Sequence, residues 1–215
     1  MQTRVRRFSI VASVVAWSAV SILVAQPVLA GKYNPTANIG DQGAAWVDLP
    51  GVDNQRHSLK DLEKRDVIVV VFTCNSCPYA VDYEERINRL AQKYQSPDSR
   101  VAVVAINVNK IEADLLPAMQ KRAQARKFSF PYLYDETQQI AKAYGAVRTP
   151  EFFVLNKARQ IVYMGAMDDN TKEAEVKTRY VEDAIQATLN GQAIKERETP
   201  PVGCAIRFAR DRKKS

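Results

Sequence analysis

Residues 66–78 read DVIVVVFTCNSCP, and this stretch decides the fold that the sequence predicts. The six apolar residues at 67–72, four of them valine and one isoleucine, are bounded by an acid and a threonine. A run of this length and composition is typical of a strand buried on both faces, as in a parallel sheet. Cys74 and Cys77 follow with C-x-x-C spacing, and Pro78 comes next. The stretch therefore predicts a central strand that delivers two thiols to the start of a helix.

The segments around this stretch predict an α/β domain. Apolar residues three and four positions apart over 77–94 indicate an amphipathic helix, and the sequence VAVVAINV at 101–108 indicates a second buried strand. A strand, a helix and a strand in this order form a right-handed parallel unit. Further helices are expected at 116–126, 137–144 and 180–189, an antiparallel hairpin at 151–155 and 160–167, and an N-terminal hairpin at 46–49 and 55–57.

The chain divides into four parts. In residues 1–30, three arginines precede an apolar run that ends in a small-residue cleavage pattern, as in a secretory signal peptide. The apolar run is long for such a peptide, so an uncleaved membrane anchor is the alternative. A linker is expected at 31–38, the folded domain at 39–191, and a C-terminal tail with Cys204 and a basic end at 192–215. The protein is therefore expected to be exported to the periplasm or another extracytoplasmic compartment.

The charge of the mature chain lies in its tail. Removal of residues 1–30, with three arginines and no acid, lowers the net charge from +7 to +4. Residues 207–215 hold five basic side chains and one acid, which accounts for all of that charge. Aromatic residues do not alternate with these charges, so the sequence predicts a solvated terminus and no nucleic-acid partner. Membrane contact is expected only if residues 1–30 remain attached.

The two thiols of the C-x-x-C motif indicate disulfide exchange. A thiol attacks a disulfide as its thiolate, and an ordinary cysteine is mostly protonated at neutral pH. A position at a helix N-terminus is expected to lower the pKa of Cys74, and Cys77 is close enough to resolve a mixed disulfide on Cys74. A structural zinc site needs about four ligands, and only one other cysteine and one histidine are present. The sequence therefore predicts neither a metal nor another cofactor.

The segment Arg148-Thr149-Pro150 gives a second signal, since it lies between an expected helix end and an expected strand. A cis peptide bond between Thr149 and Pro150 would leave the backbone of Thr149 free to pair with a substrate strand. A trans bond is the default alternative for such a dipeptide.

With these residues the sequence resembles the thioredoxin-like superfamily, in the redoxin branch that groups alkyl hydroperoxide reductases with thiol-specific antioxidant proteins. The resembling segments are 46–59, 74–78, 130–135, 148–150, 168–170 and, in some members, 199–208. The resemblance implies a thioredoxin-like fold, with a central mixed sheet flanked by helices and an N-terminal β-hairpin. It also implies Cys74 as attacking thiol, Cys77 as resolving thiol and Pro150 as a cis proline beside them. Protein thiols and disulfides would be the substrates, with an unidentified thiol as electron donor or acceptor.

The site departs from thioredoxin itself in several positions. Thr73, Asn75 and Ser76 stand where thioredoxin has tryptophan, glycine and proline, so its reduction potential does not carry over. Thr73 remains a candidate supporting residue of the site. The acid that thioredoxin buries behind its cysteines falls on Ile68 here, which leaves the internal proton acceptor unidentified.

Two other functions compete with thiol–disulfide exchange. A thiol peroxidase with antioxidant activity is one, with Arg148 as an activating cation if it faces Cys74. Neither C-x-x-C cysteine, however, lies in the peroxiredoxin pattern P-x-x-x-T-x-x-C. A copper assembly protein is the other, with Cu(I) held by Cys74 and Cys77 and with His57 as the added ligand.

Three further residues need an assignment. Cys204 makes the number of thiols odd, which in an exported chain flags a reactive thiol. It could be a third redox thiol, pairing with Cys74 or with a partner chain, or a small buried residue under a packed tail. Asp168 and Asp169 are expected to brace a loop, since adjacent carboxylates of an extended chain point apart. Together the sequence predicts an exported thiol–disulfide oxidoreductase.

Overall fold

The computed structural model describes residues 31–209, so the predicted signal peptide and the last six residues lie outside the described part of the chain. The strands are β1 (Leu49–Pro50), β2 (Arg56–His57), β3 (Val67–Phe72), β4 (Val101–Asn107), β5 (Tyr132–Tyr134), β6 (Arg148–Thr149), β7 (Glu151–Leu155), β8 (Ile161–Gly165) and β9 (Cys204–Ala205). The α-helices are α1 (Pro78–Lys93), α2 (Leu116–Arg126), α3 (Gln139–Tyr144) and α4 (Tyr180–Leu189), and the 3-10 helices are η1 (Leu59–Leu62), η2 (Glu112–Asp114) and η3 (Glu173–Glu175).

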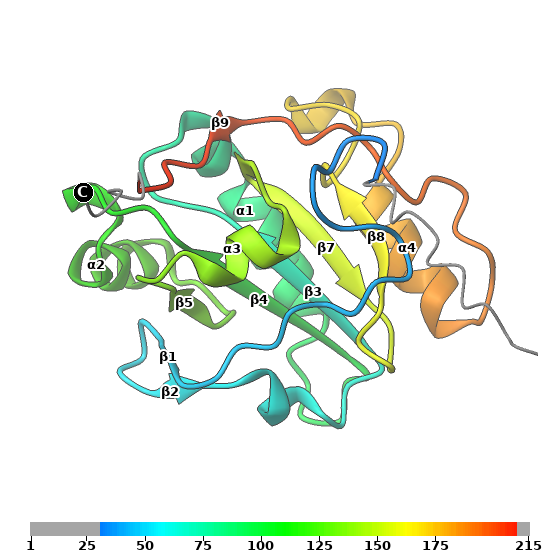
Figure 1. The fold of residues 1–215 in the computed structure, drawn as a ribbon, viewed down its shortest axis with the longest axis horizontal. Coiled ribbons are helices and arrows are strands. Elements are labelled where there is room, and N and C mark those ends of the chain that lie inside the picture. The colour runs from blue at the N-terminus through cyan, green and yellow to red at the C-terminus, as the bar shows by residue number, and fades with distance from the viewer. Residues whose placement is uncertain (1–30, 210–215) are drawn as a thin grey trace, which may run out of the picture.

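A five-stranded mixed sheet forms the centre of the domain, in the order β5-β4-β3-β7-β8 (Figure 1). β3 runs parallel to β4, and β4 runs parallel to β5. β7 is antiparallel to both β3 and β8. The predicted α/β class is confirmed, including the central mixed sheet, the flanking helices and the hairpin of β7 and β8.

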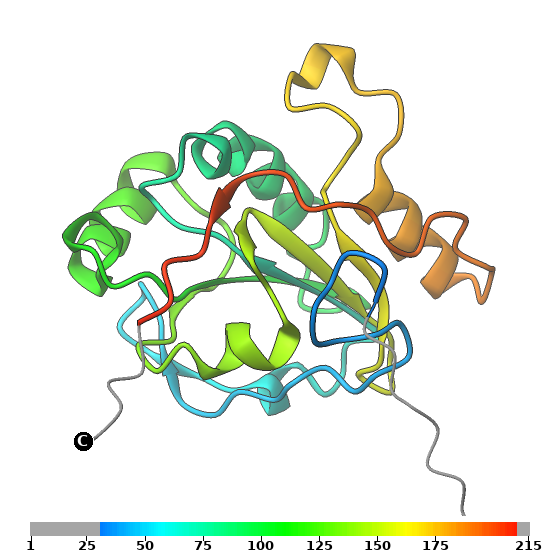
Figure 2. The same ribbon diagram turned by 45° about the horizontal axis from the view of Figure 1, so that its top comes forward.

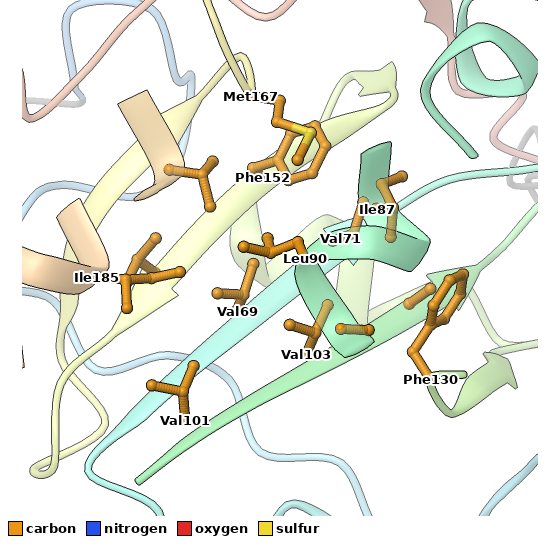
Figure 3. Close-up of a cluster of buried hydrophobic side chains, with 14 of the residues drawn as sticks. Val69, Val71, Ile87, Leu90, Val101, Val103, Phe130, Phe152, Met167 and Ile185 are labelled. Atoms are coloured by element: carbon orange, nitrogen blue, oxygen red, sulfur yellow. The ribbon is translucent and has the colours of Figure 1, made fainter. Parts of the chain in front are cut away.

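Both faces of β3 are covered, and all six of its residues have an exposed fraction of 0%. Val67, Val69 and Val71 pack with α1, α2 and α4 on one face, where Figure 3 shows Leu90 beside the strand. The alternate residues Ile68, Val70 and Phe72 pack with α3, η1 and the N-terminal segment on the other face. Each buried side chain of this size contributes about 1.5–3 kcal/mol to folding. The predicted double burial of the central strand is confirmed.

Helix α1 begins where the sequence predicts, with Cys77 as its N-cap and Pro78 in its first turn. Its apolar positions face the sheet, but two of its charged residues, Glu84 and Arg86, are also buried. Arg122 of α2 donates hydrogen bonds from Nε and Nη2 to the two carboxylate oxygens of Glu84, at 2.7 and 3.0 Å. Glu84 is buried because it joins α1 to α2 through this pair.

Arg86 connects α1 to the loop after β8. Its Nη1 lies 2.6 Å from Oδ2 of Asp168, and Oδ1 of the same carboxylate accepts a hydrogen bond from the hydroxyl of Tyr83 at 3.0 Å. Both members of this ion pair are buried. Asp169 accepts a hydrogen bond from the backbone N–H of Lys177. The two adjacent acids therefore brace the loop, as predicted.

The N-terminal part is more closely packed than its composition indicates. The segment 31–38, expected to be a linker, is anchored by Asn34, which is buried and donates from Nδ2 to the carbonyl of Tyr144 at 2.8 Å. The predicted N-terminal hairpin is present but short, because β1 and β2 pair over two residues each. Ser58 forms a capping box with Asp61, at the start of a 3-10 helix. Within residues 31–209, no helix has the length and apolar character needed to cross a membrane.

The packing of α1 on the sheet can be tested at Ile87, which is 1% exposed and lies in this core. We expect Ile87→Ala to lower the free energy of unfolding by about 2–5 kcal/mol, because it leaves a cavity in a close-packed layer. Urea unfolding measures the change. Val47→Ala, at a residue that is 74% exposed, is the control. Equal effects of the two substitutions would show that α1 does not pack as described.

Candidate active site

The two cysteines of the motif lie where β3 ends and α1 begins. Thr73 extends β3 by one residue, since its N–H donates to the carbonyl of Ile106 at 3.1 Å. Cys74 and Cys77 are only 3% and 2% exposed, and they form a small cluster with Ala80 in the first turn of α1. All three cysteines of the chain are free thiols. The site therefore consists of two buried thiols at the carboxyl end of the central strand β3.

Thr149 is the residue against which both sulfur atoms lie. Sγ of Cys74 is 3.4 Å from Oγ1 of Thr149, and Sγ of Cys77 donates to the carbonyl oxygen of Thr149 at 3.0 Å. The peptide bond from Thr149 to Pro150 is cis, which is one of the two alternatives that the sequence leaves open. The structure thus brings together Cys74, Cys77, Thr149 and Pro150 from segments more than 70 residues apart.

The C-terminal segment occupies the free edge of β6. Strand β9 pairs with β6 in antiparallel register, with Thr149 opposite Cys204. Beyond this pair, the N–H of Ile206 donates to the carbonyl of Val147 at 2.9 Å. Both views show β9, drawn in red, beside the start of β7 and the first turn of α1 (Figures 1 and 2). The backbone of Thr149, which the sequence analysis expected to pair with a substrate, therefore pairs with the protein's own tail.

Arg148 does not have the role that was considered for it. Its Nη1 donates to the carbonyl of Gly203 at 2.9 Å, so the guanidinium fastens the tail. The hypothesis that Arg148 faces Cys74 as an activating cation is wrong, because its side chain is directed to the β9 segment. Gly203 itself is required there, since a Cβ atom at this position would collide with the backbone of Thr149.

Cys204 is in direct contact with the thiol pair. Its N–H donates to Sγ of Cys77 at 3.4 Å, and its side chain packs against the cluster of Cys74, Cys77 and Ala80. Its side chain is partly exposed, unlike the other two thiols. The contact with the sulfur of Cys77 means that the third cysteine belongs to the same site.

The pKa of Cys74 was expected to be lowered, but in the structure it is raised, and the pKa of Cys77 is lowered instead. Burial raises the pKa of Cys74, the negative charge of Asp114 raises it further, and the hydrogen bonds to Thr149 and Ser76 only partly offset these effects. Burial also opposes ionisation of Cys77. Hydrogen bonds from the Cys204 side chain, from backbone N–H groups and from Thr149 outweigh it, so the pKa of Cys77 is lowered. The predicted lowering of the pKa of Cys74 is therefore wrong, because burial and the charge of Asp114 outweigh the effects that stabilise its thiolate.

Asp114 is a site residue that sequence reasoning missed. Its carboxylate is fully buried and accepts hydrogen bonds from the N–H groups of Asn75 and Ser76, at 2.8 and 2.9 Å. It also accepts from the hydroxyl of Ser76 at 2.6 Å and from Nδ2 of Asn109 at 3.0 Å. One buried side chain thus fixes the loop between the two cysteines. An acid in a polar segment after β4 gives no such signal in the sequence.

Glu151 is the second buried acid near the site. It follows Pro150, is 2% exposed, and accepts hydrogen bonds from the N–H groups of Val147 and Arg148, at 2.8 and 3.0 Å. Burial raises its pKa to about 7. Ile68, where thioredoxin places an acid, is a fully buried apolar residue of the core. Glu151 is therefore a titratable group at the start of β7, two residues after Thr149.

The residues that a copper site would need are not gathered. His57 lies in the N-terminal hairpin, with Nε2 3.0 Å from the carboxylate of Asp53. Within residues 31–209 there is no group of three or more histidine, cysteine, aspartate and glutamate side chains that could hold a metal ion. The structure thus brings Cys204 to the thiol pair but leaves His57 elsewhere.

Comparisons with known proteins show relatives of this chain in sequence and in fold. The sequence model of the AhpC/TSA family matches residues 39–164. An uncharacterized conserved protein from Geobacillus kaustophilus is 33% identical, with a TM-score of 0.74 over 82% of this chain and 95% of that chain. A hypothetical protein from Sinorhizobium meliloti 1021 is 30% identical, with a TM-score of 0.74 over 82% and 97%. Peroxidoxin BcpB from Mycobacterium tuberculosis shares the fold, at 20% identity and a TM-score of 0.54 over 71% and 96%. No curated protein gives a significant match.

The influence of Asp114 on Cys74 can be measured directly. We expect Asp114→Asn to lower the pKa of Cys74, because the substitution removes a negative charge that disfavours the thiolate. The rate of iodoacetamide alkylation at Cys74, followed by mass spectrometry as a function of pH, should reach its midpoint at lower pH. Glu112→Gln, at an exposed carboxylate nearby, is the control and should leave the midpoint in place. A midpoint that rises in Asp114→Asn would contradict the proposed effect.

Glu151 should make stability depend on pH in a defined window. Because burial raises its pKa from 4.5 to about 7, the folded state favours the protonated acid. The contribution of Glu151 to the free energy of unfolding is complete below pH 4.5 and is lost as the pH rises to about 7. The free energy of unfolding of the wild type, relative to Glu151→Gln, should therefore fall across this window in urea titrations. Glu136→Gln, at an exposed side chain, is the control. A difference that stays constant with pH would contradict the assignment.

Proposed function

The chain belongs to the AhpC/TSA family, and from this premise we propose that it is a thiol–disulfide oxidoreductase that works through Cys74 and Cys77. The family match and the shared fold support the redoxin resemblance that the sequence analysis stated. The observation that carries the proposal is the contact of both sulfur atoms with Thr149, one with its side chain and one with its carbonyl. A substrate strand that pairs with β6 would lie directly beside both thiols.

The exchange proceeds in two steps. The thiolate of Cys74 attacks one sulfur of a substrate disulfide, forms a mixed disulfide and releases the other substrate sulfur as a thiolate. Cys77 then attacks Sγ of Cys74, which closes the Cys74–Cys77 disulfide and releases the second substrate thiol. The lowered pKa of Cys77 supports this step, because a resolving thiol also attacks as its thiolate. The same steps in reverse order oxidise a pair of substrate thiols.

Access to Cys74 requires that the tail move. Burial is the largest cause that raises the pKa of Cys74, and Cys204 of the β9 segment packs against the cluster that contains Cys74. When β9 leaves β6, the edge of β6 becomes available to a substrate, and any burial of Cys74 by the tail is removed. We therefore assign the role of attacking thiol to Cys74, and Thr149 presents the edge to which an extended substrate segment binds. Protein disulfides and thiols fit this edge, with a thiol compound as the second partner.

Thiol peroxidase activity has less support in this site. The side chain of Arg148, the candidate activating cation, is engaged with the carbonyl of Gly203. Cys74 is 3% exposed, and its pKa is raised, whereas attack on a peroxide requires an accessible thiolate.

Export stays part of the proposal. It rests on the basic and apolar pattern of residues 1–30, which would place the protein in an extracytoplasmic compartment.

Reduction of insulin disulfides by dithiothreitol tests the proposal. We expect the wild type to accelerate the reaction and Cys74→Ser to lower the rate to that of dithiothreitol alone, because the attacking sulfur is absent. Cys77→Ser should accumulate a mixed disulfide with insulin on Cys74, visible on a non-reducing gel, because the resolving thiol is lost. Val47→Ala, remote from the site and exposed, is the control. Equal rates for the wild type and Cys74→Ser would remove the proposal.

A further inference from the structure

We propose that Cys204 is a third redox thiol of this site, which takes over the disulfide from the buried Cys74–Cys77 pair by forming a bond with Cys77. This inference rests on the thiol–disulfide exchange proposed above and adds an internal acceptor to it. It also explains why the protein's own tail lies where a substrate strand is expected.

The position of β9 is the first observation. β9 pairs with β6 in the register that places Cys204 opposite Thr149, the residue that contacts both active-site sulfur atoms. A peptide that presents a cysteine to the thiol pair would have to occupy this same edge. The tail therefore resembles a bound substrate strand that carries its own thiol.

Two features of the chain around Cys204 hold the thiol in this position. Gly203 allows the tail to approach closely, because any larger residue would collide with the backbone of Thr149. Arg148 adds a hydrogen bond from Nη1 to the carbonyl of Gly203 at 2.9 Å. On the other side of Cys204, Ile206 is buried in the core and donates its N–H to Val147. The tail is thus fixed both before and after the cysteine.

The contact with Cys77 is the second observation. The N–H of Cys204 donates to Sγ of Cys77, and the side chain of Cys204 packs against the cluster that holds Cys74 and Cys77. A cysteine that only filled space would be buried among apolar groups, whereas Cys204 is partly exposed and packs against the two other thiols. The contact identifies Cys77, and not Cys74, as the sulfur that Cys204 can attack.

The transfer step is balanced without a further reactant. Once the Cys74–Cys77 disulfide has formed, the thiolate of Cys204 attacks Sγ of Cys77 and forms the Cys77–Cys204 bond. The Cys74–Cys77 bond breaks, and its electron pair remains on Cys74, which takes up the proton that Cys204 lost. An external dithiol then reduces the Cys77–Cys204 disulfide, gives two hydrogens to these sulfur atoms and becomes a disulfide itself.

The charges of the site favour this order of events. In the reduced protein the hydrogen bond to Cys77 is the first cause that raises the pKa of Cys204 to about 11. When the sulfur of Cys77 enters a disulfide it carries no charge, so this cause is removed and Cys204 ionises more readily. The transfer also moves the disulfide from two cysteine residues that are 3% and 2% exposed to a pair that includes the partly exposed Cys204. A reductant can therefore reach it more easily.

Disulfide mapping tests the inference. The reduced protein is treated with one equivalent of glutathione disulfide, free thiols are blocked with N-ethylmaleimide at low pH, and tryptic peptides are analysed by mass spectrometry. Trypsin leaves Cys74 and Cys77 together in the peptide 66–86 and Cys204 in the peptide 198–207. We expect these two peptides to be joined by a disulfide, with N-ethylmaleimide on Cys74. In addition, Cys204→Ala should slow reduction of the oxidised protein by dithiothreitol by about tenfold, since the exposed sulfur is lost.

A register variant provides the matched control. In the double substitution Cys204→Ala with Ala205→Cys, the thiol moves by one residue along β9, so it should point to the opposite side of the strand. We expect no joined peptides from this variant. Gly203→Ala, which keeps Cys204 but obstructs the approach of the tail, should greatly reduce their yield. Val202→Ala, at an exposed residue beside it, should preserve the yield.

The outcomes separate this inference from the proposed function. If the reduced wild type consumes insulin disulfides in a single turnover, but Cys204 is found alkylated beside an internal Cys74–Cys77 disulfide, the inference is wrong and the proposed function stands. A bond from Cys204 to Cys74, or to a second copy of the chain on a non-reducing gel, overturns it as well. If the wild type shows no more single-turnover reaction with insulin than Cys74→Ser, the proposed function itself fails.

Discussion

The pairing of β6 with β9 is the interaction on which the site depends. Thr149 in β6 contacts the sulfur atoms of Cys74 and Cys77, and its register partner across the ladder is Cys204. One short backbone ladder therefore brings Cys204 of the C-terminal tail to the two thiols that follow β3. The rigid frame behind it is the doubly buried strand β3, which fixes where the two-cysteine loop leaves the sheet.

The surroundings of the thiols give each a different character. Cys74 is buried beside the charge of Asp114 and is held as a thiol, whereas hydrogen bonds at the start of α1 and from the tail favour ionisation of Cys77. Asp114 at the same time orders the loop through the N–H groups of Asn75 and Ser76. The structure is thus a closed form, in which β9 occupies the edge of β6 beside the two thiols.

The features that could be predicted from the sequence are those that depend on a local pattern of residues. The apolar run of β3 and the periodicity of α1 were sufficient for the central strand–helix–strand unit, and the spacing of Cys74 and Cys77 was sufficient for the candidate chemistry. Contacts made by residues far apart in the chain were missed. The hydrogen bonds of Asp114 join segments about 40 residues apart, and the direction of Arg148 depends on a tail 55 residues away. The pKa of Cys74 was predicted wrongly for the same reason, because burial by distant segments outweighs the nearby helix end.

Equilibration in glutathione buffers of increasing oxidising power tests the central claim most directly, because it measures whether the thiols at Thr149 act as a pair. Counting free thiols at each ratio of reduced to oxidised glutathione should show one two-electron transition, in which two of the three thiols are lost together. This result would give the reduction potential of the site. Stepwise loss of single thiols, with glutathione attached to Cys74 and no intramolecular disulfide at any ratio, would contradict the claim that these cysteines form an exchange site.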